Sequence, residues 1–157
     1  MPDISGKTAG YLGRNTKLYR STAGDAGPWT LVPETVSIEP SEPSTEKVDR
    51  THLNSPGRRR ENRLGYIDDG TVAVVCNALD ATLDAAGDAI HVAIYNAQGA
   101  HDANQYWKKT AEDDAAVVHK TWIFPGDIET AGWGPFQGGA GVDFRFTILK
   151  TGISVIT

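Results

Sequence analysis

The stretch from Glu46 to Cys76, EKVDRTHLNSPGRRRENRLGYIDDGTVAVVC, determines which fold the chain can adopt. Its first eight residues alternate as a β-strand does but are polar on both sides, and a strong turn signal, NSPG at 54–57, follows them. The chain then runs back, so we predict a long hairpin over residues 46–66 that protrudes from the body of the protein. The next segment, GTVAVVC at 70–76, is nearly all apolar and predicts a central strand.

The predicted hairpin is basic, whereas the chain that follows it is acidic. Residues 67–130 contain eleven acidic residues and three lysines, a balance of −8. Residues 46–66 contain three acidic and six basic residues, a balance of +3; the basic ones are Lys47, Arg50, Arg58, Arg59, Arg60 and Arg63. Two interpretations are open. One is a solvated surface with chance clustering, and the other is self-complementarity, in which the basic segment of one copy contacts the acidic face of the next.

Further strands are predicted on both sides of this stretch. In VDFRFTIL, residues 142–149, apolar and polar residues alternate, so four side chains are expected to point into the core: Val142, Phe144, Phe146 and Ile148. Other alternating or apolar segments predict strands at residues 17–21, 29–38 (interrupted at Pro33), 91–95 and 117–124.

Little helix is expected. Apolar residues at positions 79, 83 and 86 have helical spacing, Asp80 is a candidate cap for the first turn, and Gly87 is expected to end this short helix. A little more helix is possible within residues 101–109. Residues 1–15 contain three glycines and are expected to form a flexible arm. Together these elements predict a single all-β domain over residues 1–157: a two-sheet β-sandwich or small barrel with one short flanking helix and a long protruding hairpin.

Composition excludes several classes of protein. A chain of 157 residues, 39% of them hydrophobic, can bury one core. Its net charge of −5 argues against a surface that binds nucleic acid throughout, because such surfaces cluster Lys and Arg. No apolar run approaches the roughly 18 residues of a membrane span, and the first ten residues lack the apolar core of a secretion signal. The single cysteine, Cys76, fits assembly in a reducing cytoplasm.

No motif for catalysis or for a cofactor is present. The four histidines, at positions 52, 91, 101 and 119, lack metal-site spacing and are expected at the surface or at an interface. The glycine-rich segment 132–141 lacks the pattern of a phosphate loop, and no GxSxG motif occurs. The paired aspartates at 68–69 and 113–114 are adjacent, so in a strand they point to opposite faces. We therefore expect no enzyme activity, no catalytic residue, no cofactor and no metal site.

The segment Val32 to Asn77 resembles the major tail tube proteins of long-tailed (siphophage-type) bacteriophages. The resemblance rests on VPETVSIEP, then VDRTH at 48–52, NSPG at 54–57, the arginines at 58–60, Gly65 and DGTV at 69–72. The closing strand with its ending, VDFRFTILKTG at 142–152, is also similar to that family.

The resemblance implies an architecture and a role. Members of that family are two packed β-sheets with a flanking helix; they form hexameric rings whose inner sheets join into a barrel around a channel. A long loop, matching residues 47–66 here, reaches neighbouring subunits and the adjacent ring. Rings stack head to tail, and double-stranded DNA passes through the lumen during genome ejection. A lumen that is acidic or neutral suits this passage, because like charges do not retain a moving polyanion.

Partners and assembly residues follow from the same resemblance. The implied partners are further copies of the chain, the tape measure protein, the tail terminator and the distal tail protein, with no specific DNA binding and no membrane. The implied location is the tail of the virion, assembled in the host cytoplasm. Three adjacent guanidinium groups do not suit a monomer's core, so we expect the basic hairpin to pair with carboxylates of a neighbour. The predicted assembly residues are Lys47, Arg50, His52, Arg58, Arg59, Arg60 and Arg63.

Two alternatives remain open at this point. One is another virion tail protein of the same fold, such as a tail terminator or a baseplate hub component, which differs in the length of the assembly it forms. The other is a carbohydrate-binding β-sandwich, which requires exposed, coplanar Trp or Tyr rings. Against it, Trp29, Trp122 and Trp133 fall in predicted strands, where we expect them to be buried in the core.

Overall fold

The computed structural model describes residues 16–52, 57, 60–113, 115–139 and 141–157. The predicted flexible arm over residues 1–15 lies outside the described residues, as do Arg58 and Arg59. Within the described residues the chain forms ten strands and one helix: β1 (Thr16–Ser21), β2 (Thr30–Leu31), β3 (Thr35–Pro40), β4 (Ser44–Asp49), β5 (Asn62–Asp68), β6 (Thr71–Asn77), α1 (Ala85–Asn96), β7 (Tyr106–Glu112), β8 (Val118–Trp133), β9 (Asp143–Lys150) and β10 (Val155–Ile156). The predicted fold class, all-β with one flanking helix, is confirmed.

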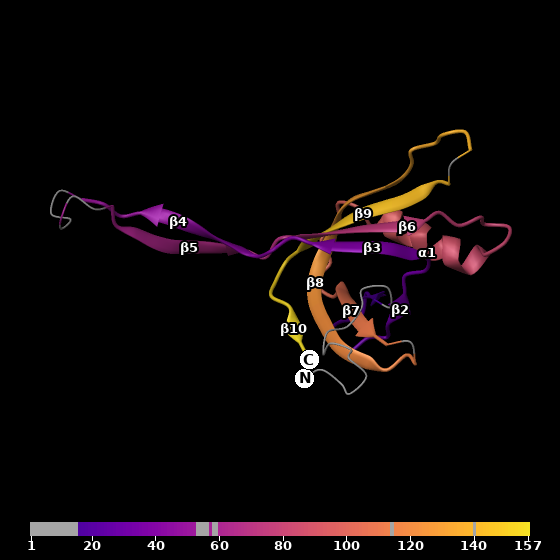
Figure 1. The fold of residues 1–157 in the computed structure, drawn as a ribbon, viewed down its shortest axis with the longest axis horizontal. Helices are drawn as coiled ribbons and strands as arrows, with labels where there is room; N and C mark the ends of the chain where they lie inside the picture. The colour runs from indigo at the N-terminus through magenta and orange to yellow at the C-terminus, as the bar shows by residue number, and fades with distance from the viewer. Residues whose placement is uncertain (1–15, 53–56, 58–59, 114, 140) are drawn as a thin grey trace, which may run out of the picture.

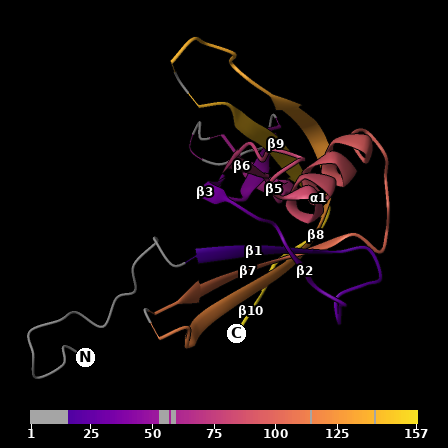
Figure 2. The same ribbon diagram turned by 90° about the vertical axis from the view of Figure 1, so that its right-hand side faces the viewer.

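Eight strands form one antiparallel sheet that folds over into two layers. The strand order is β2-β1-β7-β8-β9-β6-β3, with β10 also paired to β8. Figure 2 shows β1 and β7 in one layer and β3, β6 and β9 in the other, with α1 beside them. Strand β8 belongs to both layers, because its first half pairs with β7 and its second half with β9.

The core lies between these two layers. As predicted, Phe144, Phe146 and Ile148 of β9 are buried, while Arg145 between them is exposed. Val142 precedes the strand and is only half-buried. Buried side chains come from both layers and from α1: Leu18, Val32, Val72, Val74, Cys76, Ile94, Trp107, Phe124 and Ile128. The alternation in β6 and β9 thus defines one wall of the core, as a half-buried strand requires.

Strand β8 is longer than predicted. We expected a strand over residues 117–124, but β8 continues to Trp133. Where it changes partners, the buried carbonyl of Gly126 accepts hydrogen bonds from Gln105 Nε2 at 2.9 Å and from Trp107 Nε1 at 3.1 Å. A Cβ at this glycine would lie 2.6 Å from Ile148 Cγ2. The two side-chain donors satisfy a buried backbone group that the sheet ladder leaves open, so the strand can continue through the bend.

Helix α1 begins later than predicted. Its N-cap is Asp84, whose carboxylate accepts a hydrogen bond from the backbone N–H of Gly87 at 2.9 Å. Asp80 instead closes a turn before the helix, where it accepts from the backbone N–H of Thr82. Gly87 does not end the helix but lies buried in its first turn, where a Cβ would come within 2.6 Å of Leu79 Cδ1. The glycine therefore permits close packing of the preceding loop.

The predicted strand HVAIY is wrong, because these residues form the second half of α1. Only His91 and Ile94, three positions apart, are buried, whereas Val92 and Tyr95 are 37% and 45% exposed. His91 is thus not the surface or interface residue that we expected; it stacks on Phe144 with ring centroids 4.7 Å apart. A short apolar run fits either a strand or one turn of a buried helix, and here packing against β9 selects the helix.

The possible helix within residues 101–109 does not form. This part of the chain leads into β7, which pairs with β1 and β8. Lys108 Nζ lies 4.5 Å from the centroid of the Tyr19 ring, and Lys109 Nζ lies 4.4 Å from a ring centroid of Trp122. The methylene groups and ammonium groups of lysine pack well on aromatic rings. Strand β7 can therefore include Lys108 and Lys109, although such polar residues suggest a surface segment.

Strands β4 and β5 form the predicted hairpin. They pair only with each other, in a two-stranded antiparallel sheet separate from the body. In Figure 1 the hairpin extends from one end of the molecule along its longest axis, and α1 lies at the other end. The hairpin thus presents both of its faces away from the body. No helix in the described part of the chain is long and apolar enough to cross a membrane.

Candidate assembly surface

The hairpin is a regular structure up to the last residues described near its tip. Beyond the end of β4, the backbone N–H of Arg50 donates to the Glu61 carbonyl at 2.7 Å. The backbone N–H of Glu61 donates to Thr51 Oγ1 at 2.9 Å. Thr51 in turn donates its backbone N–H to Asp49 Oδ1 at 2.8 Å. These bonds continue the ladder past the strands and hold the two chain segments together near the tip.

Hydrogen bonding near the tip also changes the pKa of the Asp49 carboxylate. Hydrogen bonds from the Thr51 side chain and backbone lower the pKa of Asp49, and the nearby Arg60 guanidinium contributes in the same direction. The ionised form of Asp49 therefore suits this part of the hairpin, because it accepts the bonds that shape the turn.

The described members of the predicted assembly set all lie on the hairpin and are exposed: Lys47, Arg50, His52, Arg60 and Arg63. His52 Nε2 lies 3.4 Å from Glu61 Oε2, so this histidine has a carboxylate partner within its own hairpin. Lys47 stands opposite Leu64, and Arg63 stands opposite Val48, which places cations on both faces of the two-stranded sheet. The hairpin thus gathers the residues predicted from the sequence, with Arg58 and Arg59 outside the described residues.

Three large apolar side chains on the same hairpin were missed by sequence reasoning. Leu64, Tyr66 and Ile67 of β5 are 75%, 86% and 64% exposed. A register shift between Thr45 and Lys47 places two residues of β5 against one of β4, so Leu64 and Ile67, the partners of Lys47 and Thr45, fall on the same face. The signal was present in the run LGYI, which is too apolar for a solvated loop. Exposed apolar residues gathered on one projecting element indicate a surface for association.

The Val48 side chain of β4 packs closely against Gly65 of β5. At Gly65, within the register shift, a Cβ would come within 2.9 Å of Val48 Cγ2. The absence of a side chain at this glycine lets the valine lie directly against the backbone of β5. Gly65 therefore allows β4 and β5 to pack closely at the register shift.

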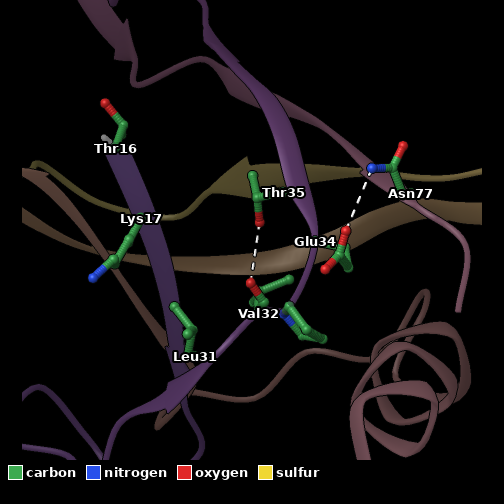
Figure 3. Close-up of a pocket in the computed structure, with 8 residues that line it drawn as sticks. Thr16, Lys17, Leu31, Val32, Glu34, Thr35 and Asn77 are labelled. Atoms are coloured by element: carbon green, nitrogen blue, oxygen red, sulfur yellow. Dashed lines mark hydrogen bonds between the residues drawn. The ribbon is translucent and has the colours of Figure 1, made fainter. Parts of the chain in front are cut away.

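An open cavity of about 300 Å³ lies between the start of β1 and the connection from β2 to β3 (Figure 3). Asn77 Nδ2 donates to Glu34 Oε2 at 3.4 Å, and Thr35 Oγ1 donates to the Val32 carbonyl at 3.1 Å. Lys17, also in the lining, forms an ion pair with the buried Glu112 at 2.7 Å. The charged side chains that line the cavity, Lys17 and Glu34, are therefore paired with other protein groups. The lining contains no nucleophile beside a base.

The tryptophans do not form an open platform. Trp29, Trp122 and Trp133 are partly buried, and the fully buried tryptophan is Trp107. Lys108 lies over the Trp29 ring at 5.0 Å, and Lys109 lies over Trp122, so amines occupy ring faces that a sugar would need.

The described residues that could bind a metal or act as a nucleophile do not form such a site. Among the described residues no three His, Cys, Asp or Glu side chains gather in a group that could hold a metal ion. Burial raises the pKa of the Cys76 thiol to about 11, which removes its nucleophilic form near neutral pH. Two further histidines form exposed pairs, His101 with Asp127 at 2.6 Å and His119 with Asp113 at 3.2 Å.

The two-layered sheet, the flanking helix and the projecting hairpin define the class of the fold: it is the tail tube fold of phage-like tails. A chain of the PVC sheath–tube complex, an extracellular contractile injection system in its extended state, matches with a TM-score of 0.70, 10% identity and coverage of 95% of this chain and 92% of that chain. A chain in the structure of the anti-feeding prophage cap, described as tube-terminating, matches with a TM-score of 0.67, 12% identity and coverage of 100% and 99%.

The SPP1 tail tube supplies a phage example. It matches with a TM-score of 0.59 and 14% identity over 94% of this chain and 79% of that chain. These three matches are structural parts of tails and injection systems, and none is an enzyme, as expected for this chain from its sequence. No protein-family model and no curated protein matches the chain. At these identities the comparisons establish the fold.

Proposed function

We propose that the chain is a structural, non-enzymatic subunit of a phage-like tail and that it forms the tail tube. The observation that carries the proposal is the exposed β4–β5 hairpin, whose three large apolar side chains and five described basic or histidine residues have no cover from the chain's own body. A monomer gains nothing from exposing such a surface, whereas an assembly buries it. Chains of the same fold occur in a sheath–tube complex and in a tail tube, which supports the proposal.

In this proposal, copies of the chain form hexameric rings that stack head to tail. The hairpin, with Lys47, Arg50, His52, Arg58, Arg59, Arg60 and Arg63, contacts neighbouring subunits. The stacked rings enclose a channel through which double-stranded DNA leaves the particle. The tape measure protein, the tail terminator and the distal tail protein are the other partners, and the assembled protein resides in the virion tail after assembly in the host cytoplasm.

The charge of the chain agrees with a conduit rather than with a DNA-binding surface. The net charge is −5, with a balance of +3 in the hairpin segment 46–66 and of −8 in residues 67–130. Once the hairpin is covered by a neighbour, the remaining surface is acidic and repels a polyanion. DNA therefore passes without specific binding in this account.

A tail terminator is the second candidate, and one observation favours it. The chain in the tube-terminating cap covers this chain completely and has a TM-score of 0.67, close to the 0.70 of the sheath–tube complex. The fold is thus shared by proteins that extend a tube and by structures that end one. What separates the two roles is the length of the assembly.

Negative-stain electron microscopy of the purified chain at high concentration tests the proposal. A tube subunit is expected to form long stacks of rings with a central hole. Rings that never stack would identify a terminator instead. Particles without a central hole, or monomers at every concentration, would contradict both roles.

A further inference from the structure

We propose that the hairpin of one copy docks on the outward face of helix α1, and on the loop before it, in another copy. This inference rests on the proposed function and names the partner surface of the same hairpin. It follows from three properties of the described residues: matching apolar exposure, opposite charge, and the placement of the two surfaces at opposite ends of the molecule.

The acceptor surface is a stripe along α1. Asp88, Val92 and Tyr95 have i, i+4, i+7 spacing, so they share one face of the helix. Val92 and Tyr95 are 37% and 45% exposed, and Leu83 in the loop before the helix is 86% exposed. The adjoining face, with His91 and Ile94, is buried against the sheet, and Asp88 at the edge of the stripe is half-buried. The Tyr95 ring also packs against Trp133, with ring centroids 5.2 Å apart, so the helix presents apolar side chains that its own fold covers only in part.

The donor surface carries the matching groups. On the hairpin, Lys47 and Leu64 are cross-strand neighbours, so a cation and a large apolar side chain lie side by side on one face. Leu64 is 75% exposed, and Tyr66 and Ile67 follow on the same strand. Against the helix stripe, Leu64 is expected to meet Val92 and Tyr95 while Lys47 meets Asp88.

Charge selects this helix over other surfaces. The segment between Arg63 and Lys108 contains no Lys or Arg but six aspartates. Three of them lie in or just before α1: Asp80, Asp84 and Asp88. A basic hairpin is therefore attracted to the helix end of another copy, and opposite charge fixes the register of an apolar contact.

The two surfaces cannot meet within one chain. The hairpin extends from one end of the longest axis, and α1 lies at the other end (Figure 1). The contact is therefore between copies and joins two different surfaces. Such heterologous contacts propagate with one polarity, and they either close into a ring or continue as a filament.

Cysteine cross-linking between two differently labelled chains tests the contact. Leu64→Cys is mixed with Tyr95→Cys, or in parallel with Leu31→Cys, under assembly conditions and a mild oxidant. Leu31 is the matched control, because it is 44% exposed on β2, beside the 45% of Tyr95. The native Cys76 is fully buried and does not compete. We expect a covalent heterodimer with Tyr95→Cys and none with Leu31→Cys; Val92→Cys serves as a second acceptor if Tyr95→Cys alters folding.

Reversing the charges of Lys47 and Asp88 provides a second test of the contact. Lys47→Glu places like charges against Asp88, so the concentration needed for assembly should rise about tenfold or more, and Asp88→Lys in the same chain should restore it. Assemblies that cross-link through Leu31→Cys alone, or that Asp88→Lys fails to restore, would overturn the helix contact while leaving the proposed function intact. A wild-type chain that never assembles would contradict the proposed function and this inference together.

Discussion

Phe146 lies at the centre of the core, 2% exposed, with its ring centroid 5.6 Å from those of both Trp107 and Phe144. We predict that Phe146→Ala lowers the free energy of unfolding by about 3–5 kcal/mol, because it removes apolar burial and leaves a cavity. Its neighbour Arg145 is exposed and pairs with Asp143 at 3.0 Å, so Arg145→Ala should cost less than about 1 kcal/mol. Denaturant unfolding of the two variants measures this difference, and equal losses would mean that the register of β9 is wrong.

Cys76 on the neighbouring strand is fully buried, and burial raises the pKa of its thiol to about 11. Only the thiolate reacts with disulfide reagents, so at about pH 8 the native chain should react very slowly. In denaturant the same thiol should react at once. A spectrophotometric thiol assay measures both rates, and fast reaction of the native chain would show that β6 opens readily.

His101 gives the fold a pH-dependent contact. The hydrogen bond to Asp127 at 2.6 Å, and then the charge of that carboxylate, raise the pKa of His101 above its ordinary value of 6.5. Because the folded pKa is raised, the stability from this pair is fully present below about pH 6.5 and is lost as pH rises through the folded pKa.

The stability difference between wild type and His101→Gln should therefore be larger at about pH 6 than at about pH 9. An NMR titration of His101 measures the pKa directly, and Asp127→Asn should return it toward the ordinary value. A pKa at or below the ordinary value in the wild-type chain would refute the assigned pairing.

Single residues also show what the sequence could and could not reveal. The alternation around Phe144 and Phe146 predicted their burial, because in a strand the side-chain period alone assigns the face. His91 was misplaced and the burial of Trp107 was not predicted, since each depends on a partner far away in the sequence: the Phe144 ring for one and the Gly126 carbonyl for the other. No local pattern contains those partners.

At the scale of elements, the hairpin and the strand β6 were predictable because a turn signal and a continuous apolar run are local properties. A short helix was also predicted, but the extent of α1 and the existence of strand β7 were not. The segment HVAIY becomes helical through packing on β9, and β7 forms because aromatic rings of β1 and β8 take up Lys108 and Lys109. Tertiary contacts override weak local preference in both elements.

The hairpin is the element on which assembly should depend. We predict that Arg58→Glu/Arg59→Glu/Arg60→Glu leaves the melting transition of the monomer unchanged, because the described part of the hairpin pairs only with itself and contributes no residue to the core. The same variant should fail to form tubes, since each lost charge pair at a buried interface costs roughly 2–5 kcal/mol and recurs in every subunit.

The matched control for that variant keeps the charge. Arg58→Lys/Arg59→Lys/Arg60→Lys should still assemble, although more weakly, because lysine cannot make the bidentate contacts of arginine. Sedimentation velocity of the three chains, with calorimetry for the melting transition, gives both readouts. Normal tubes from the glutamate variant would show that the basic tip takes no part in assembly.

At the scale of the whole molecule, the chain has polarity. One end carries a basic hairpin with uncovered apolar side chains, and the other carries α1, with Asp80, Asp84 and Asp88 in or just before it. The charge asymmetry was visible in the sequence, but the placement of the two segments at opposite ends was not, because it depends on how the sheet folds over through β8. Because the two oppositely charged surfaces lie at opposite ends, contacts between copies would add subunits in one orientation along the assembly.

A cryo-electron microscopy reconstruction of the assembled wild-type chain tests whether the hairpin joins copies of the chain into a hollow tube. We expect a hollow stack of hexameric rings in which the β4–β5 hairpin of every copy lies against another copy and the channel surface is acidic or neutral. A solid particle, or a ring in which the hairpins extend into solvent without contacting a neighbour, would contradict it.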